Sequence, residues 1–400
     1  MISTCTTLRQ RLLGTDAGVL VFLLRLLLLP LSGLYGLGTT ARNALYDAGL
    51  LAQVRVKAPV VSVGNLTVGG TGKTPMVVLL ANRAAQAGRK VAVVARGYGA
   101  VADAHGNTDE VALIAARCPG VRVVVGPDKT ASARRAVAEG ADFVIVDDGL
   151  QHRRLQRDAE VVMVDARAPF GNGSVLPGGP LREAPSGLSR ASIIVLTHGE
   201  TLEDEQRQTV LSQVRAFRRP VPVVWAEHVA SGVRPVTGGR LLPAESLAGR
   251  DVFLFSGIAS PGGFRQTVET LGGRVSGVLA FPDHHDFSAA DMARVRAAAR
   301  DALLLCTEKD AQKIARIPGH DDVLCLVIEL RLAGRLPPLP GLDAPWEPPR
   351  EQPADGQHAP AAHGADTGHA AQGHAVPAAP PGHGQPVPAG AGGHRGGDHH

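Results

Sequence analysis

The sequence is poor in cysteine and in aromatic residues. Its four cysteines, Cys5, Cys118, Cys306 and Cys325, share no Cys-x-x-Cys spacing. They indicate neither a disulfide framework nor a zinc site, and are expected to be buried, reduced thiols of a cytosolic protein. Phe, Trp and Tyr make up only 4% of the 400 residues, and no basic stretch is interleaved with aromatic side chains. Nucleic acid is therefore not an expected partner.

An excess of charge of one sign is also missing. Lys and Arg number 41 against 37 acidic residues, which gives a formal net charge of +4. This small excess is compatible with an anionic membrane surface or a phosphorylated substrate, and it is too weak to indicate nucleic-acid binding. A chain of this length can bury a full core, and we expect two domains.

The sequence does contain a glycine-rich loop between a strand signal and a helix signal. Residues 64–75 read GNLTVGGTGKTP, after the apolar run 60–63 and before the helix-like stretch 76–87. Backbone N–H groups of such a loop bind the phosphates of ATP at a helix N-terminus, its lysine bridges the terminal phosphates, and its threonine hydroxyl holds Mg²⁺. The predicted ATP-binding residues are Thr67, Val68, Gly69, Gly70, Thr71, Gly72, Lys73 and Thr74, of which Thr74 is also a predicted metal ligand.

This loop is a variant of the P-loop, because Thr67 stands where the strict pattern has glycine. Gly69 and Gly70 supply the backbone freedom instead. The alternative, a glycine-rich turn with a fortuitous Gly-Lys-Thr, is disfavoured by the strand before the loop and the helix after it.

A pair of acidic residues ends a later apolar strand. Asp147 and Asp148 follow the apolar run 143–146. An acid at this point completes the Mg²⁺ shell in P-loop enzymes, so both are candidate metal ligands. Adjacent side chains on a strand point to opposite faces, and we therefore expect only one of the two to reach the metal directly. Gln151 and His152 follow at the same rim and are candidate contacts of nucleotide or substrate.

Strand and helix signals alternate along most of the chain. They predict an α/β fold of the P-loop NTPase type, with a doubly wound, mostly parallel sheet in residues 46–220 and a second, smaller α/β domain in residues 221–335. We expect strands at 60–63, 90–95, 121–125, 142–147, 161–165, 192–197, 222–228, 252–258, 273–281, 302–307 and 323–330. We expect helices at 75–87, 110–117, 129–138, 202–217, 262–271, 288–300 and 309–316. Residues 336–400 are rich in Pro, Gly, Ala and His and are predicted to be a disordered tail.

The N-terminal segment 1–45 is strongly apolar. Its run 17–31 is interrupted by Arg25 and should be broken by Pro30, so a bilayer-crossing helix is not expected. Export as a signal peptide would take an ATP-binding domain to a place without ATP. Two readings stay open, an apolar helix lying in the membrane interface and an ordinary buried helix. Arg42, Arg55 and Lys57 nearby suit peripheral contact with a cytoplasmic membrane face.

The ordered series of motifs resembles the tetraacyldisaccharide 4′-kinase family, the lipid A 4′-kinases of Gram-negative bacteria. That family carries threonine at the first position of its P-loop, as Thr67 does here. The resemblance covers roughly residues 17–335. Further matching motifs are RGYG at 96–99, VGPDK at 125–129, DDGLQH at 147–152, FGNG at 170–173, LPGGPLRE at 176–183 and TEKD at 307–310.

The resemblance implies transfer of the ATP γ-phosphoryl group to the 4′-hydroxyl of a tetraacylated glucosamine disaccharide 1-phosphate. It also implies peripheral work at the cytoplasmic face of the inner membrane, where that lipid resides. No obligate protein partner is inferred. The family's catalytic base is an aspartate in a Gly-Asp-Glu-Pro motif, helped by a histidine of the second domain. Asp109 of the sequence NTDEV is the candidate base here, although only its two acids match, and His284 is preferred over His285 as its helper.

Two arginines and one other function class are left open. Arg96 and Arg182 could each hold a phosphate or form a structural ion pair. A membrane-docked P-loop switch or assembly ATPase is the alternative to a lipid kinase. That class would have a second lysine early in the loop, but residues 67 and 68 are Thr and Val. TEKD also lacks the asparagine of a guanine-reading motif, so the sequence favours the kinase.

Overall fold

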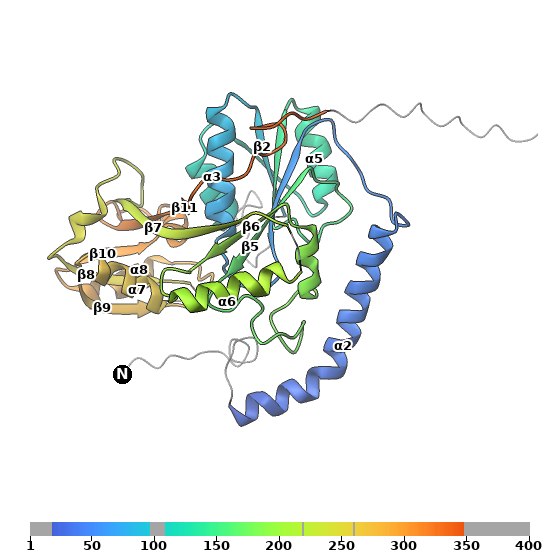
Figure 1. Ribbon diagram of the computed structural model, residues 1–400. Helices are drawn as coiled ribbons and strands as arrows, with labels where there is room; N and C mark the ends of the chain where they lie inside the picture. Colours follow the sequence, from blue (N-terminus) through green and yellow to red (C-terminus); the bar gives the residue numbers. More distant parts are fainter. Residues whose placement is uncertain (1–17, 97–108, 218–219, 259–260, 348–400) are drawn as a thin grey trace, which may run out of the picture. The chain divides into compact units, whose positions relative to one another are not determined.

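The computed structural model describes residues 18–96, 109–217, 220–258 and 261–347. One continuous sheet of eleven strands runs through this part of the chain, in the order β3-β2-β4-β1-β5-β6-β7-β11-β10-β8-β9 (Figure 1). Its strands are β1 (Val60–Asn65), β2 (Val91–Ala95), β3 (Arg122–Val125), β4 (Phe143–Asp147), β5 (Ala159–Asp165), β6 (Ile193–Thr197), β7 (Val223–Pro235), β8 (Asp251–Ser256), β9 (Arg274–Ala280), β10 (Leu303–Thr307) and β11 (Leu324–Ala333).

In the described part of the chain, one helix precedes the first strand, and the helices after it connect the strands in the manner of βαβ units. The helices are α2 (Val19–Asp47), α3 (Lys73–Gln86), α4 (Asp109–Arg117), α5 (Lys129–Ala138), α6 (Asp204–Arg215), α7 (Pro261–Thr270), α8 (Ala289–Ala299) and α9 (Glu308–Ile314). The α/β class, the mostly parallel sheet and each predicted strand and helix are confirmed.

A single antiparallel pair joins the two halves of the sheet. β7 and β11 lie antiparallel from Leu324↔Pro235 to Ala333↔Trp225, whereas the other neighbouring strands pair in parallel. β7 extends to Pro235 and is therefore longer than the predicted strand at 222–228. The halves on either side of this pair therefore share one continuous sheet.

Both faces of the first half are covered by helices, which explains its runs of consecutive apolar residues. Val61 of β1 is buried on the face packed by Met76 and Leu80 of α3. Val60 is buried on the opposite face with Ala133 of α5. Each such side chain contributes about 1.5–3 kcal/mol when fully buried. This packing holds the end of β1, and with it the glycine-rich loop, in place.

The N-terminal apolar segment forms one helix. We expected Pro30 to break it, and this was wrong, because α2 continues through Pro30 to Asp47. Figure 1 shows that α2 changes direction along its length, as a proline inside a helix explains. The helix is long and apolar enough to cross a membrane by length and composition alone. Most of its large apolar side chains are exposed, among them Leu27 at 74% and Leu34 at 69%.

The segment after residue 335 also differs from the prediction. The disordered tail was expected to begin at residue 336, but Leu336 and Leu339 are buried in the core of the first half, with Leu342 packed beside them. The rest of the predicted tail, residues 348–400, lies outside the described residues. Of the four cysteines, Cys118, Cys306 and Cys325 are buried free thiols, as predicted, and Cys5 lies outside the described residues.

Candidate active site

The glycine-rich loop links the carboxyl end of β1 to the N-terminus of α3. Gly69 and Gly72 adopt positive φ angles of 121° and 84°, a backbone conformation that suits glycine and little else. Gly72 also has no space for a side chain, because a Cβ there would lie 2.9 Å from Nε2 of His228. Lys73 and Thr74 begin the helix, so the eight predicted ATP-binding residues form one loop whose N–H groups precede a helix N-terminus.

The lysine of the loop is held by polar neighbours on its own sheet edge. Lys73 Nζ donates to Oδ1 of Asn65 at 3.1 Å and lies 3.6 Å from Oδ1 of Asp148. Burial lowers the pKa of Lys73, against the opposing charge of Asp148. A buried ammonium of this kind lacks full compensation until an anion arrives, and ATP phosphates are such an anion.

The two aspartates at the carboxyl end of β4 have different environments, because Asp147 is the last residue of the strand and Asp148 lies in the turn after it. Asp147 is half-buried, but its Oδ1 atom is buried and has no hydrogen-bond partner among the described residues. Burial raises the pKa of Asp147 to about 6. An orphaned carboxylate oxygen beside the helix that begins with Lys73 and Thr74 fits a Mg²⁺ ligand, because a hard cation prefers carboxylate and hydroxyl oxygens.

Asp148 is instead an anion with protein partners. Arg182 Nη1 contacts both of its carboxylate oxygens, at 2.8 and 2.7 Å. Burial alone would raise the pKa of Asp148, but Lys73 and Arg182 outweigh it and lower the pKa to about 2. Arg182, whose role the sequence left open, therefore makes an ion pair at the site. Arg96 is exposed after the end of β2, and its charge contributes to the lowered pKa values of Lys129 and His152.

A second lysine at this edge was not among the predicted site residues. Lys129 is 2% exposed, and its Nζ donates to the backbone oxygens of Asp147 and Asp148 at 2.5 and 2.7 Å. It therefore holds the turn in which Asp148 has a positive φ of 52°. Burial lowers the pKa of Lys129 to about 8. Its sequence signal was the VGPDK motif, to which no role had been given.

The segment Pro180–Glu183 supports the outer side of the loop. Val68 N donates to Pro180 O at 2.8 Å, and Arg182 N donates to Leu66 O at 2.7 Å. Glu183 is 1% exposed and accepts from Gln151 Nε2 at 2.9 Å.

The apolar helix α2 contacts this segment and Gly178 just before it. Tyr35 Oη of α2 donates to Arg182 O at 2.8 Å, and Ser32 Oγ accepts from Gly178 N at 2.9 Å. These two contacts tie the exposed apolar helix to the edge that carries the P-loop.

His152 was a candidate contact of nucleotide or substrate. Burial lowers the pKa of His152 to about 4, so its imidazole is neutral.

Asp109 and His284 come from opposite halves of the sheet and are in contact. Asp109 begins α4, and His284 lies in the loop after β9 with a positive φ of 61°. His284 Nδ1 is 3.1 Å from Asp109 Oδ2. His285 is engaged elsewhere, with Nε2 3.1 Å from Oδ2 of Asp291. Of the two histidines, His284 is thus the one that contacts Asp109, and its role as the helper of the base stays a prediction.

A charge at the N-terminus of α4 acts on the carboxylate at the end of β4. The charge of Glu110, next to Asp109, contributes to the raised pKa of Asp147. α4 follows β2, which pairs in parallel with β4 as β1 does, so Asp109 follows a strand whose carboxyl end lies at the same sheet edge as the ends of β1 and β4. Residues 97–108, between β2 and α4, lie outside the described ranges.

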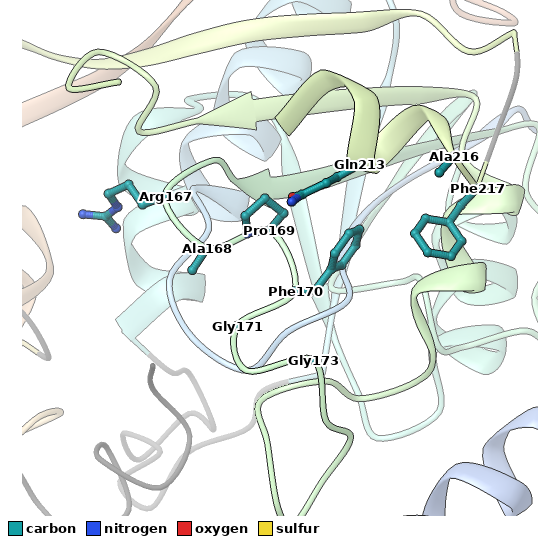
Figure 2. A pocket seen from close by; sticks show the side chains of 9 residues that line it. All are labelled: Arg167, Ala168, Pro169, Phe170, Gly171, Gly173, Gln213, Ala216 and Phe217. Carbon is teal, nitrogen blue, oxygen red and sulfur yellow. The ribbon is translucent and has the colours of Figure 1, made fainter. Parts of the chain in front are cut away.

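Two cavities are lined by residues of the motifs described above. One, of about 340 Å³, is lined by Thr74 and by residues of α3, α4 and β11. The other, of about 570 Å³, lies at the FGNG motif, where Figure 2 shows Phe170 facing Phe217 from the end of α6. Their rings meet edge to face at 5.5 Å. No residue of the glycine-rich loop lines this second cavity, so volume alone does not locate the phosphate site.

The chain is similar to proteins of one family over most of its length. A family profile described as "Tetraacyldisaccharide-1-P 4'-kinase" matches residues 24–338. A tetraacyldisaccharide 4'-kinase of Anaeromyxobacter sp. (strain Fw109-5) is 44% identical over 323 residues, which cover 75% of this chain and 85% of that protein. One of Syntrophus aciditrophicus (strain SB) is 38% identical over 333 residues, covering 77% and 89%.

A solved structure supports the same assignment. The crystal structure of LpxK from Aquifex aeolicus in complex with ATP is 30% identical, with a TM-score of 0.63, and the match covers 77% of this chain and 95% of that one. The sequence-derived resemblance is thereby confirmed for the fold and for the family. The chain belongs to the tetraacyldisaccharide-1-phosphate 4'-kinase family.

Proposed function

We propose that this chain transfers the γ-phosphoryl group of ATP to the 4′-hydroxyl of a tetraacylated glucosamine disaccharide 1-phosphate. The observation that carries the proposal is the contact of Asp109 with His284 at the sheet edge that carries the P-loop. Family membership supplies the substrate class, and the ATP complex of the Aquifex aeolicus relative supports the nucleotide. A switch or assembly ATPase is not favoured, because the similar proteins are named kinases.

The reaction requires an in-line displacement at the γ-phosphorus. The 4′-hydroxyl oxygen forms the new P–O bond while the bond to the β–γ bridging oxygen breaks and ADP leaves. Asp109 accepts the hydroxyl proton as the attack proceeds, and His284 orients the carboxylate through Nδ1. Lys73 and the N–H groups of the loop stabilise the negative charge on the phosphoryl oxygens.

Mg²⁺ is the metal that this chemistry would use, and when bound it would supply positive charge to neutralise the phosphate oxygens. The hydroxyl of Thr74 and the orphaned Oδ1 of Asp147 would hold it. Asp148 is the weaker candidate, because Arg182 already binds both of its oxygens.

Because the acceptor is a lipid, the enzyme has to bind it at a membrane surface. We propose that α2 lies on the cytoplasmic leaflet of the inner membrane, with its exposed leucines in the interface. Each buried side chain would contribute about 1.5–3 kcal/mol, and basic residues near an anionic surface about 1 kcal/mol each. The contacts of Ser32 and Tyr35 would then hold the 176–183 segment close to the bilayer.

A phosphoryl-transfer assay tests the proposal. Purified protein, γ-labelled ATP and a disaccharide 1-phosphate lipid in mixed micelles should give a labelled bisphosphorylated lipid. An acceptor whose 4′-hydroxyl is blocked should give none. Lys73→Ala serves as the control for the P-loop and should lower turnover by about 10²-fold or more. Label that appears only as inorganic phosphate would instead identify an ATPase.

A further inference from the structure

The motif TEKD at residues 307–310 has no part in the reaction described so far, yet it begins the helix that contacts both Asp109 and the loop that carries His284. This is α9, which follows β10 in the second half of the sheet. Thr307 caps the helix, and its Oγ1 donates to Asp310 Oδ2 at 2.6 Å. The start of α9 is therefore held firmly, and its side chains project from a fixed base.

Three side chains of α9 form ion pairs with α4. Lys313 Nζ lies 2.8 Å from Asp109 Oδ2, and Lys309 Nζ lies 2.8 Å from Glu110 Oε1. These two lysines are four residues apart and so share one face of the helix. At the other end of α4, Arg117 Nη1 lies 2.9 Å from Glu308 Oε2. The helix that carries the proposed base is thus fixed at both ends to the second half of the sheet.

The same helix also holds the loop that carries the histidine. Lys313 Nζ donates to the backbone oxygen of His285 at 2.9 Å. Asp310 Oδ1 accepts from Gly257 N at 3.2 Å, and Gly257 O accepts from His284 N at 3.0 Å. Both members of the pair therefore depend on α9 for their position.

Lys313 is the residue on which these contacts converge. Its side chain is 7% exposed, compared with 30% for Lys309. Lys313 and His284 both contact Oδ2 of Asp109, at 2.8 and 3.1 Å. Two partners on one oxygen fix the rotation of the carboxylate, and hence the direction in which Oδ1 points. Such a charge-assisted, buried contact restricts geometry more than an exposed ion pair does.

We propose that Lys313 is a positioning residue, which holds the Asp109 carboxylate and the His284 loop in one reactive geometry across the two halves of the sheet. The inference rests on the proposed role of Asp109 as base. Its physical basis is that a misplacement of about 1 Å at a reacting group can cost about 10²-fold in rate. The remaining pairs of α9, through Lys309 and Glu308, hold the helices together without touching Asp109.

The first test compares two lysines of the same helix. Lys313→Met keeps the apolar stem and removes the charge, and it should lower kcat by about 10²-fold with the KM for ATP within about threefold of wild type. Lys309→Met removes the same charge from a pair with Glu110, and it should change kcat by less than about fivefold. Lys313→Arg keeps the charge and should recover at least tenfold of the lost kcat. Equal kcat losses in the two Met variants would overturn the proposal and leave α9 a structural clamp.

The second test asks whether Lys313 acts through Asp109. In an Asp109→Asn background, Lys313→Met should cost less than about threefold further, because residues that act as one unit lose their effect together. A further 10²-fold loss would show an independent role and overturn the proposal. The double variant also removes both charges of the pair, so it stays measurable even where Lys313→Met alone folds poorly. Full activity in Asp109→Asn would instead refute the proposed base, and normal kcat in Lys313→Met alone would refute only the positioning role.

Discussion

Nδ1 of His284 lies 3.1 Å from Oδ2 of Asp109, although 175 residues of chain separate the two. One residue begins a helix of the first half of the sheet, and the other follows the edge strand of the second half. The contact exists only because the long antiparallel pair β7–β11 joins the halves into one sheet. The acceptor site that we propose draws on both halves and therefore depends on that junction.

Removal of the proposed base should separate chemistry from nucleotide binding. Asp109→Asn should lower kcat by about 10²–10⁴-fold, because general base catalysis is lost, with ATP affinity near wild type. His284→Ala should lose less, since it only orients the carboxylate. His285 is the matched control, because it pairs with Asp291 and stacks on Phe281. His285→Ala should therefore lower the melting temperature and leave kcat close to that of wild type. Steady-state kinetics and ATP titration calorimetry check these outcomes, and loss of ATP binding in Asp109→Asn would make Asp109 a nucleotide-side residue.

The Mg²⁺ requirement should respond to Asp147 before Asp148. Asp147→Asn removes the orphaned buried oxygen, and it should raise the Mg²⁺ concentration for half-maximal activity by about tenfold or more. Asp148→Asn should act through Arg182 and Lys73, and raise the KM for ATP instead. Activity measured against Mg²⁺ at saturating ATP distinguishes them. An unchanged titration in Asp147→Asn would assign the metal to Asp148.

Acid should destabilise the protein through His228, which packs behind Gly72 of the P-loop. Burial, assisted by the charge of His198, lowers the pKa of His228 to about 4, against 6.5 for a free imidazole. The folded state thus binds the proton less well than the unfolded state. Stability from this neutral group is complete above pH ~6.5 and is lost as the pH falls toward ~4.

The magnitude follows from the same linkage. At pH ~4.5 the loss should be about 2–3 kcal/mol, and His228→Gln, which cannot acquire the charge, should lose correspondingly less between pH ~7.5 and ~4.5. Urea unfolding at the two pH values measures the loss of unfolding free energy in wild type and in the variant. Parallel losses in wild type and variant would place the acid-sensitive group elsewhere.

The membrane contact should be separable from folding by substitutions on α2 that spare its contacts with the body. Leu27→Glu with Leu34→Glu places charges on two well-exposed positions while Ser32 and Tyr35 remain. The variant should shift toward the soluble fraction in vesicle flotation, and its KM for lipid should rise far more than its KM for ATP.

Two deletions complete that comparison. Deletion of residues 1–38 should give the same membrane defect but also lose the two contacts to the 176–183 segment, and so some stability. Deletion of residues 351–400 should change neither flotation nor kinetics. An intact flotation profile in the double glutamate variant would place the membrane contact elsewhere.

The sequence by itself determined the local elements of this protein. The P-loop, its helix start and the acidic end of β4 depend on neighbours within a few residues. Glycine is needed at Gly69 and Gly72 for their positive φ angles, and burial on both sheet faces gives the strands their continuous apolar runs. The motif order was also sufficient for the family. The association of Asp109 with His284 came from that resemblance and not from the residues themselves.

Only the tertiary structure decided which charged side chains meet. Arg182 binds Asp148, Lys129 holds the Asp-Asp turn and Lys313 contacts Asp109, and none of these partners could be chosen from a sequence with many equivalent lysines, arginines and carboxylates. Two local signals were also misleading: α2 continues through Pro30, and packing buries Leu336 in the core beyond the predicted end of the fold. Long-range partners follow from how the sheet and its helices pack, and that free energy is summed over the whole core and cannot be read from any short segment.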